Sequence, residues 1–352
     1  MNRLTILLAG FLHMAIALSC SASGGSYVNL NAGKDDPVPF TYKLSKGKIK
    51  LSWKKTGILE RSTDLNHWYG IRKGRTYYVK PEEEFAYFRV RTALPRPTRM
   101  YLPKGYDPQK KYPLILNLHG FGGNGIWQES YFSLKLLADE LGFAFCAPDG
   151  LFNSFGSQKW NATDACCGGP DDMTDDSGYL KAIIDSALNR YSIDEDSIHV
   201  TGLSNGGFMS YRMAQDHSDI IASIAPVAGV GQWDKSMVKL KSPVQVLHIH
   251  ATGDGVITWN GGDNFNAYPS VLDNIANWVE YNECTEKTEE KKAINVDSDS
   301  SDKETDITKY TNPKNGCTVE LWKVNGSQHV IPFTLESRRR IVKWMLEHRN
   351  IR

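Results

Sequence analysis

The chain has 352 residues, which exceeds one typical domain and allows a sizeable hydrophobic core. Its 41 Lys+Arg and 40 Asp+Glu leave a formal net charge of +1 at pH 7. A chain so close to neutral has no strong electrostatic attraction for nucleic acid or for an anionic membrane surface, so we exclude nucleic acid as a partner.

The first 20 residues predict a secretory signal peptide. A basic start at Arg3 precedes an apolar run that reaches Leu18. The run is too short and too weakly flanked for a stable transmembrane span, so we expect a secreted protein, extracellular or periplasmic. Residues 17–20 also approximate a bacterial lipobox, which would make Cys20 a lipid-anchored N-terminus.

Two segments precede the main domain. Residues 21–39 are rich in Ser, Gly and Asn without a period, which predicts a flexible linker. Short runs within residues 40–93 alternate between apolar and polar positions, a pattern typical of a small antiparallel β accessory module. The module offers no convergent catalytic groups, so we expect a structural accessory, with a spacer role or weak glycan binding as the alternatives.

Residues 97–352 predict the catalytic domain, with an α/β fold on a doubly wound, mostly parallel sheet. Continuous apolar strands alternate with helical patterns, as in a parallel sheet that helices cover on both faces. A hairpin with strands at 307–311 and 318–324, followed by a terminal helix at 335–348, completes the domain. We expect the charged, serine-rich residues 285–306 to form a solvated loop.

A G-x-S-x-G pattern at residues 202–206 predicts a nucleophilic serine. A strand leads into the pattern and a helix follows it, which is the context of a nucleophile elbow. Gly202 and Gly206 would let the strand and the helix pass close together, with Ser204 at the apex. The alternative is a glycine-rich turn with an ordinary serine.

A serine hydroxyl becomes a good nucleophile when a base takes its proton and an acid orients that base. In α/β-hydrolases the chain order is Ser, then Asp or Glu, then His. Asp254 follows the strand at 244–250, and His329 lies in a loop just past the strand at 318–324, so both fit this order after Ser204.

Each partner has an alternative reading. Asp254 precedes a glycine and could be only a turn former. His248 and His250 lie within a buried strand, where a hydrogen-bonded core histidine is the more common state. We therefore expect His329 to be the base.

An oxyanion hole requires two backbone N–H groups. One comes from the residue after the nucleophile, Asn205. The glycine-rich loop at 118–125 follows an apolar strand, and we expect Phe121 to supply the second. The loop lacks both the G-x-x-x-x-G-K-[ST] and the G-x-G-x-x-G pattern, so we expect no nucleotide cofactor.

Five separated motifs together resemble the secreted esterases grouped as polyhydroxybutyrate depolymerases, feruloyl esterases and acetyl-xylan esterases. The resemblance implies an α/β-hydrolase fold with Ser204 as nucleophile, Asp254 as acid and His329 as base, and with Phe121 and Asn205 as oxyanion donors. One departure concerns the substrate pocket, because the family usually has a glycine run before the histidine and Trp-Pro soon after it, whereas this chain has Gly-Ser-Gln-His-Val-Ile-Pro at 326–332. The motifs that carry the resemblance are residues 118–123, Trp160-Asn161 with Cys166-Cys167, residues 202–207, residues 250–254 and Gly326-x-x-His329.

The cysteines and tryptophans add further expectations. Cys284 and Cys317 bracket the charged insertion, which favours a disulfide between them in an oxidising compartment. The adjacent Cys166 and Cys167 either pair with each other or stay reduced, and Cys146 is expected to be a buried free thiol. Three tryptophans near the catalytic edge are either substrate walls or packing residues: Trp160, Trp233 and Trp259.

These expectations combine into a secreted serine esterase that acts through an acyl-enzyme and needs no cofactor or metal. The substrate would be a polymeric or polymer-derived ester, either a polyester such as polyhydroxybutyrate or feruloyl and acetyl groups on plant polysaccharide. Two alternatives stay open, a serine peptidase of the same fold and a non-catalytic protein that binds glycans or surfaces.

Overall fold

The computed structural model describes most of the chain from Gly25 onward: residues 25–30, 40–45, 48–62, 69–79, 87–91, 96, 98–153, 155–168, 172, 174–262 and 267–351. The expected signal peptide and lipobox lie outside the described residues. The chain forms two compact units, of which the first includes residues 30–97 and the second includes residues 22–29 and 98–352. In the part that the structure describes, no helix is both long and apolar enough to span a membrane.

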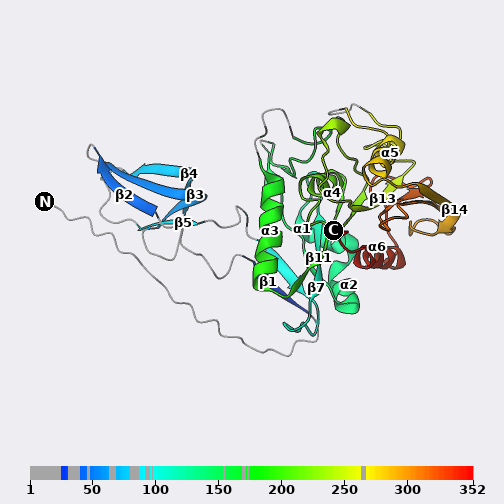
Figure 1. Cartoon of the computed structure of the whole chain (residues 1–352), viewed down its shortest axis with the longest axis horizontal. Helices are drawn as coiled ribbons and strands as arrows, with labels where there is room; N and C mark the ends of the chain where they lie inside the picture. Colours follow the sequence, from blue (N-terminus) through cyan, green and yellow to red (C-terminus); the bar gives the residue numbers. More distant parts are fainter. Residues whose placement is uncertain are drawn as a thin grey trace. The chain divides into compact units, whose positions relative to one another are not determined.

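The first unit is a four-stranded antiparallel sheet (Figure 1). Strand β3 pairs with each of the other three, because its 15 residues are long enough to meet β2 at one end and β5 at the other. The small antiparallel β module predicted from alternation is therefore confirmed as a fold element. Its strands are β2 (Phe40–Ser45), β3 (Lys48–Ser62), β4 (Tyr69–Val79) and β5 (Tyr87–Arg91).

The second unit is built on a ten-stranded sheet, in the order β1-β6-β8-β7-β11-β12-β13-β16-β15-β14. The six strands from β8 to β16 are parallel, and those outside them are antiparallel, so the predicted doubly wound, mostly parallel sheet is confirmed. The strands are β1 (Ser26–Asn29), β6 (Arg99–Leu102), β8 (Ala144–Cys146), β7 (Tyr112–Leu118), β11 (Ile193–Leu203), β12 (Ser223–Val227), β13 (Gln245–Ala251), β16 (Thr318–Val324), β15 (Thr305–Thr311) and β14 (Glu286–Ile294). A separate two-stranded ribbon joins β9 (Leu151–Phe152) to β10 (Gln158–Lys159).

Helices cover both faces of this sheet (Figure 1). Side chains of α1, α2 and α6 share one apolar core with sheet residues such as Ile115, Phe145 and Trp322. On the other face, Tyr211 of α4 packs its ring against Trp278 of α5, and α3 lies beside α4. The helices are α1 (Gly125–Phe132), α2 (Leu134–Leu141), α3 (Asp176–Arg190), α4 (Asn205–Asp216), α5 (Val271–Tyr281) and α6 (Leu335–Glu347).

Strand β1 lies within the segment expected to be a flexible linker, and that expectation is wrong for residues 26–29. The strand pairs antiparallel with β6. Its Tyr27 ring contacts the rings of Tyr101 and Phe145, and the backbone N–H of Gly25 donates to the Asp139 carboxylate at 3.1 Å. Pairing with an edge strand and packing on aromatic rings order a segment whose composition alone indicates flexibility.

The charged insertion at 285–306 is also different from the loop expected for it. Residues Glu286–Ile294 form β14, which pairs antiparallel with β15 at the edge of the sheet. Its side chains are almost all exposed, and Lys287 pairs with Glu289 at 2.6 Å. An edge strand that faces water can carry charge at nearly every position, and such charge discourages pairing with another chain.

Candidate active site

Three parallel strands bring the predicted catalytic side chains to one edge of the sheet. Strand β11 ends at Leu203 and is followed by Ser204, β13 is followed by the turn that holds Asp254, and β16 is followed by the loop that holds His329. In the sheet, β12 lies between β11 and β13, and β16 is beside β13. The carboxyl ends of parallel strands share one edge, where open α/β sheets place their ligands.

Ser204 occupies a backbone conformation that few residues other than glycine adopt. Its φ is 55° and its ψ is −120°, and its N–H donates to the Val227 carbonyl at 2.8 Å. A side chain on Gly202 would lie 2.6 Å from the Gly206 backbone, and one on Gly206 would lie 2.0 Å from the Leu118 carbonyl oxygen. Both glycines are therefore required for the close crossing of strand and helix that presents Ser204.

Asp254 is buried, and each of its carboxylate oxygens accepts hydrogen bonds. Oδ1 accepts the backbone N–H groups of Val256 and Ile257, each at 2.8 Å, and Oδ2 accepts Nδ1–H of His329 at 2.7 Å. Burial on its own would raise the pKa of Asp254, but hydrogen bonds from His250 and His329 outweigh burial and lower that pKa below its ordinary value. The carboxylate is therefore ionised at neutral pH.

The loops that carry Asp254 and His329 are packed directly against each other. The N–H of Gly326 donates to Thr252 Oγ1 at 3.0 Å, and a side chain on Gly253 would lie 2.6 Å from the Ser327 carbonyl oxygen. With Nδ1 of His329 held by Asp254, its Nε2 is the nitrogen left to act as a base. The structure describes no hydrogen bond from Ser204 to His329, a contact that often forms fully only when substrate is bound.

The glycine-rich loop lies beside Ser204. A side chain on Gly120 would lie 3.5 Å from Cβ of Ser204. The Phe121 ring is 52% exposed, and the structure describes no hydrogen bond from the Phe121 N–H. Asn205 is the first residue of α4, where a backbone N–H has no partner within the helix. Neither of the two N–H groups expected to form the oxyanion hole thus has a hydrogen-bond partner among the described contacts.

The buried side chain of His119 holds the glycine-rich loop in place through two hydrogen bonds. It is fully buried, its Nε2 accepts the Gly150 N–H at 2.9 Å, and its Nδ1 lies 2.8 Å from the Gly120 carbonyl oxygen. Because a backbone N–H can only donate and a carbonyl can only accept, the proton must be on Nδ1. The imidazole is therefore neutral and joins the loop to Gly150, the residue before β9.

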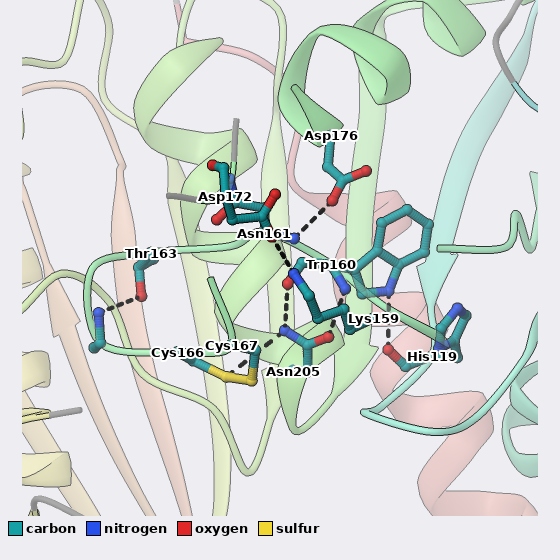
Figure 2. The surroundings of a disulfide bond; sticks show 11 residues. His119, Lys159, Trp160, Asn161, Thr163, Cys166, Cys167, Asp172, Asp176 and Asn205 are labelled. Atoms are coloured by element: carbon teal, nitrogen blue, oxygen red, sulfur yellow. Dashed lines mark hydrogen bonds and ion pairs between the residues drawn. A yellow bond between two sulfur atoms is a disulfide. The ribbon is translucent and has the colours of Figure 1, made fainter. Parts of the chain in front are cut away.

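Trp160 and the Asn205 side chain connect the glycine-rich loop at 118–125 to α4, the helix that follows Ser204 (Figure 2). The Asn205 carboxamide accepts the Trp160 N–H at 2.7 Å and donates to the Trp160 carbonyl at 3.0 Å. The indole N–H of Trp160 donates to the His119 carbonyl at 3.0 Å. Trp160 is fully buried, so the reading of this residue as a substrate wall is wrong. Its side chain instead packs in the core and holds the backbone of His119 through the indole N–H.

Cys166 and Cys167 form a disulfide with each other, which resolves the alternative left open by the sequence. Figure 2 shows this disulfide beside the Asn205 carboxamide, whose Nδ2 lies 3.6 Å from the Cys166 sulfur. Cys166 is buried, and Asn161 anchors the same loop by donating its N–H to Asp176 at 2.6 Å. The disulfide therefore packs against the side chain of Asn205, the first residue of α4.

The expected Cys284–Cys317 disulfide is absent. Both residues are buried free thiols, and the Cys284 sulfur faces the carbonyl oxygen of Cys317 at 3.7 Å rather than its sulfur. Burial raises the pKa of Cys284 to about 11 and the pKa of Cys317 to about 12. Cys146 is a buried free thiol, as expected.

The other two tryptophans differ in exposure. Trp233 is 58% exposed, and its N–H donates to Asp164 at 2.9 Å, which ties its loop to the segment that carries the disulfide. Trp259 is half-buried, with its ring edge against His250 at 6.1 Å between centroids. It also borders a cavity of about 550 Å³ between α5 and strands β14 to β16.

Sequence reasoning missed two histidines that shape the site. From the sequence, His119 is one residue of the glycine-rich loop at 118–125, and His250 is expected to be a hydrogen-bonded core histidine. His250 Nε2 lies 3.4 Å from Asp254 Oδ2, and both side chains are buried. Its position four residues before Asp254, at the end of the same strand, is the signal that could have identified it. Among the described residues, no group of three or more His, Cys, Asp or Glu side chains could hold a metal ion.

Comparisons with known proteins agree with the observed fold. Residues 113–242 match the family model of the alpha/beta hydrolase fold. The chain is 29% identical over 170 residues to the "Bifunctional acetylxylan esterase/xylanase XynS20E" of Neocallimastix patriciarum, covering 48% of this chain and 23% of that protein. It is 27% identical over 236 residues to "Feruloyl esterase B" of Piromyces equi, covering 64% of this chain and 41% of that protein. The chain thus spans less than half the length of these relatives.

A solved structure supports the fold independently. The acetyl xylan esterase from Aspergillus awamori superposes with a TM-score of 0.52 at 14% identity, covering 72% of this chain and 94% of that one. At this identity the likeness concerns the fold alone.

Proposed function

We propose that this chain, which has the alpha/beta hydrolase fold, is a serine carboxylic-ester hydrolase that works through an acyl-enzyme on Ser204. The observation that carries the proposal is the 2.7 Å hydrogen bond between His329 Nδ1 and the ionised Asp254, at the sheet edge where Ser204 stands in a strained elbow. A strained serine, a tautomer-fixed imidazole and two available N–H donors are the parts that acyl transfer requires.

The reaction proceeds in two balanced halves. His329 Nε2 takes the Ser204 hydroxyl proton while Oγ forms a bond to the ester carbonyl carbon. The same imidazole then gives its proton to the departing alkoxide as the carbon–oxygen bond breaks, which leaves an acyl-serine and a free alcohol. Water repeats the sequence and releases the carboxylic acid. Asp254 stays ionised throughout and stabilises the imidazolium that forms in each half.

The tetrahedral oxyanion is held by the backbone N–H groups of Phe121 and Asn205. Neither group has to leave another partner, so both are organised before the substrate arrives. The positive end of α4 adds to this stabilisation, because Ser204 and Asn205 are at the helix N-terminus. Loss of one such donor typically costs about 10²- to 10³-fold in kcat.

For the substrate, we propose a polymeric or polymer-derived ester met outside the cell. The relatives' names mention acetylxylan and feruloyl esters, which favours acyl groups on plant polysaccharide over a polyester such as polyhydroxybutyrate. The exposed rings of Phe121 and Trp233 are suited to contact a sugar or an aryl group. Export is supported by the signal-like residues 1–20 and by the Cys166–Cys167 disulfide, which an oxidising compartment would preserve. Lipid attachment at Cys20 is the variant of this proposal in which the exported enzyme stays on a membrane.

Hydrolysis by wild type and Ser204→Ala tests the proposal. The substrates are p-nitrophenyl acetate and butyrate, methyl ferulate, acetylated xylan and a polyhydroxybutyrate suspension, with a peptide anilide for the peptidase alternative. We expect ester turnover that is lost in Ser204→Ala and no cleavage of the anilide. If the folded wild type hydrolyses no ester, the enzyme proposal fails. If, in addition, wild type and Ser204→Ala bind a glycan equally well, the binding-protein alternative takes its place.

A further inference from the structure

A continuous row of buried side chains leads away from Asp254 into the core. His250 Nε2 lies 3.4 Å from Asp254 Oδ2, and His250 Nδ1 lies 3.2 Å from His248 Nε2. His248 Nδ1 in turn lies 2.8 Å from the Tyr211 hydroxyl, and the Asn274 side-chain amide donates to that hydroxyl at 2.8 Å. The row joins the turn after β13 to α4 and α5, and all of its members are buried.

With His250 taken as a neutral imidazole, donor and acceptor chemistry assigns the protons of this row. His250 Nε2 also lies 2.8 Å from the Ile257 carbonyl oxygen, which can only accept, so His250 carries its proton on Nε2. A neutral His250 then accepts at Nδ1, which requires the His248 proton on Nε2. His248 consequently accepts at Nδ1, and Tyr211 donates its hydroxyl proton there. Asn274 can be the donor to Tyr211 because its Oδ1 accepts the Gly231 N–H at 2.9 Å.

His248 and Tyr211 are uncharged, and their hydrogen bonds run in one direction, toward the Asp254 turn. Burial, and then the neighbouring His250, lower the pKa of His248 well below its ordinary value. Burial raises the pKa of Tyr211, against a smaller opposing effect of the Asn274 hydrogen bond. Both groups therefore stay uncharged at neutral pH, and each hydrogen bond keeps the direction deduced from geometry.

We propose that His250 is a positioning residue for the carboxylate of Asp254, and that Tyr211 and His248 hold His250 in the tautomer this role requires. The His250 Nε2–H donates to Ile257 O at 2.8 Å, and the same nitrogen lies 3.4 Å from Asp254 Oδ2. It therefore restrains both the turn whose N–H groups hold Oδ1 and the oxygen that faces His329. This inference rests on the proposed function, in which Asp254 orients the base.

A pair of substitutions at His250 separates this role from simple packing. His250→Gln keeps an N–H donor near the position of Nε2, whereas His250→Leu removes it. We expect kcat on p-nitrophenyl butyrate to fall about 10- to 100-fold in His250→Leu, the effect of losing one hydrogen bond to a charged group. KM should stay within about twofold, because the substrate is not contacted. His250→Gln should recover most of the lost kcat.

His199→Leu is the matched control. His199 is also a fully buried strand histidine held by two side chains, Ser197 at 2.9 Å and Ser223 at 2.8 Å, but these partners are serines of the core rather than a proposed catalytic residue. We expect this variant to lose stability while keeping the parent kcat. A kcat loss in His199→Leu equal to that in His250→Leu would assign both effects to general destabilisation and overturn the inference.

Tyr211→Phe extends the test to a variant that preserves volume. It removes the hydroxyl that fixes the His248 tautomer, and we expect a smaller fall in kcat, about twofold to tenfold, again without a change in KM. The inference is also overturned if folded His250→Leu retains the parent kcat, or if the Gln and Leu variants lose kcat equally. Asp254→Ala, measured in parallel, separates failure of this inference from failure of the proposed function. If Asp254→Ala retains full activity, the proposed function itself fails.

Discussion

The buried Asp254 carboxylate decides which nitrogen of His329 acts as the base. Because Oδ2 accepts the proton on Nδ1 at 2.7 Å, the imidazole is held in the tautomer that leaves Nε2 unprotonated. An amide at this position would have nearly the same shape but would present a donor to Nδ1. The charge and the acceptor character of Asp254, rather than its volume, therefore carry its role.

Asp254→Asn should consequently reduce kcat on p-nitrophenyl butyrate by roughly 10³- to 10⁴-fold, with a folded protein and a small change in KM. Asp297→Asn is a suitable control, because Asp297 is also buried but its carboxylate accepts the backbone N–H of Asp299 within its own turn rather than a histidine. Retention of more than a tenth of the parent kcat by Asp254→Asn would contradict the assigned role.

The lowered pKa of Asp254 also predicts how stability depends on pH. Between its folded pKa and the unfolded value of about 3.9, this carboxyl binds fewer protons in the folded protein than in the unfolded chain. Its contribution to stability is therefore fully present above the unfolded value and is lost as the pH falls through the folded pKa. In urea unfolding, the stability advantage of wild type over Asp254→Asn should shrink as the pH is lowered below about 4. An advantage that grows toward acid would be incompatible with a lowered pKa.

At the scale of elements, one loop connects the oxyanion side of the site to the nucleophile helix. The segment from Trp160 to Cys167 contacts His119 through the indole N–H and Asn205 through both the backbone of Trp160 and the Cys166 sulfur. Packing around Asn205 therefore depends on a loop that is closed by its own disulfide. The chemistry of that disulfide should influence catalysis without touching the substrate.

Reduction of the Cys166–Cys167 disulfide should lower kcat by about twofold to tenfold, because the loop that holds the Asn205 carboxamide loses a constraint. Activity before and after dithiothreitol, with thiol counting, measures the effect. A Cys166→Ala, Cys167→Ala double variant should have the reduced activity from the start and should not respond to the reductant. A reductant effect of the same size in the double variant would point to a different thiol.

The parts of the fold that local patterns specify could be predicted from the sequence. Apolar runs predicted the parallel strands, and the G-x-S-x-G context predicted the elbow in which Ser204 has a φ of 55°. Asp254 and His329 each follow a strand, which predicted that they share an edge, and the structure brings them into contact. The strands, the elbow and the position of each catalytic residue after its strand depend on residues that are close together in the chain.

The features that could not be predicted depend on partners distant in sequence. Strand β1 is ordered by β6, more than 70 residues later, so its composition alone indicated a linker. The contacts of Trp160 and His250 could not be predicted for a related reason, since a tryptophan near the catalytic edge and a histidine within a strand have the same sequence signature whether they pack, bind or position. Cys284 and Cys317 lie close together but are free thiols, a state that sequence spacing does not specify.

At the scale of the whole molecule, all of the proposed catalytic residues belong to the second unit, whose ten-stranded sheet has two very different edges. One edge is the exposed, charged β14, and the other is β1, which comes from the chain before the small β module. An unpaired β6 would leave backbone N–H and C=O groups open to another chain. Strand β1 therefore completes the ten-stranded sheet, although the residues of the small β module separate it in sequence from the other strands of that sheet.

Tyr27→Ala should test this edge. The Tyr27 ring contacts Tyr101 at 5.0 Å between centroids, and its hydroxyl donates to Glu129. We expect the substitution to lower the free energy of unfolding by about 1–3 kcal/mol, since it removes an aromatic contact and detaches the strand. Leu136→Ala, at an exposed position of α2, should change it by less than about 0.5 kcal/mol. Equal stability of the two variants in urea unfolding would mean that β1 contributes nothing to the sheet.

The most direct test of the catalytic account is to identify the acylated residue. Wild type mixed with p-nitrophenyl butyrate and quenched in acid within the first turnover should carry one butyryl group on the peptide that contains Ser204, as seen by mass spectrometry, with a matching burst of p-nitrophenol. The same experiment with Ser204→Ala should give neither the label nor the burst. Ester hydrolysis without a label on Ser204, or with the label on another residue, would contradict the account.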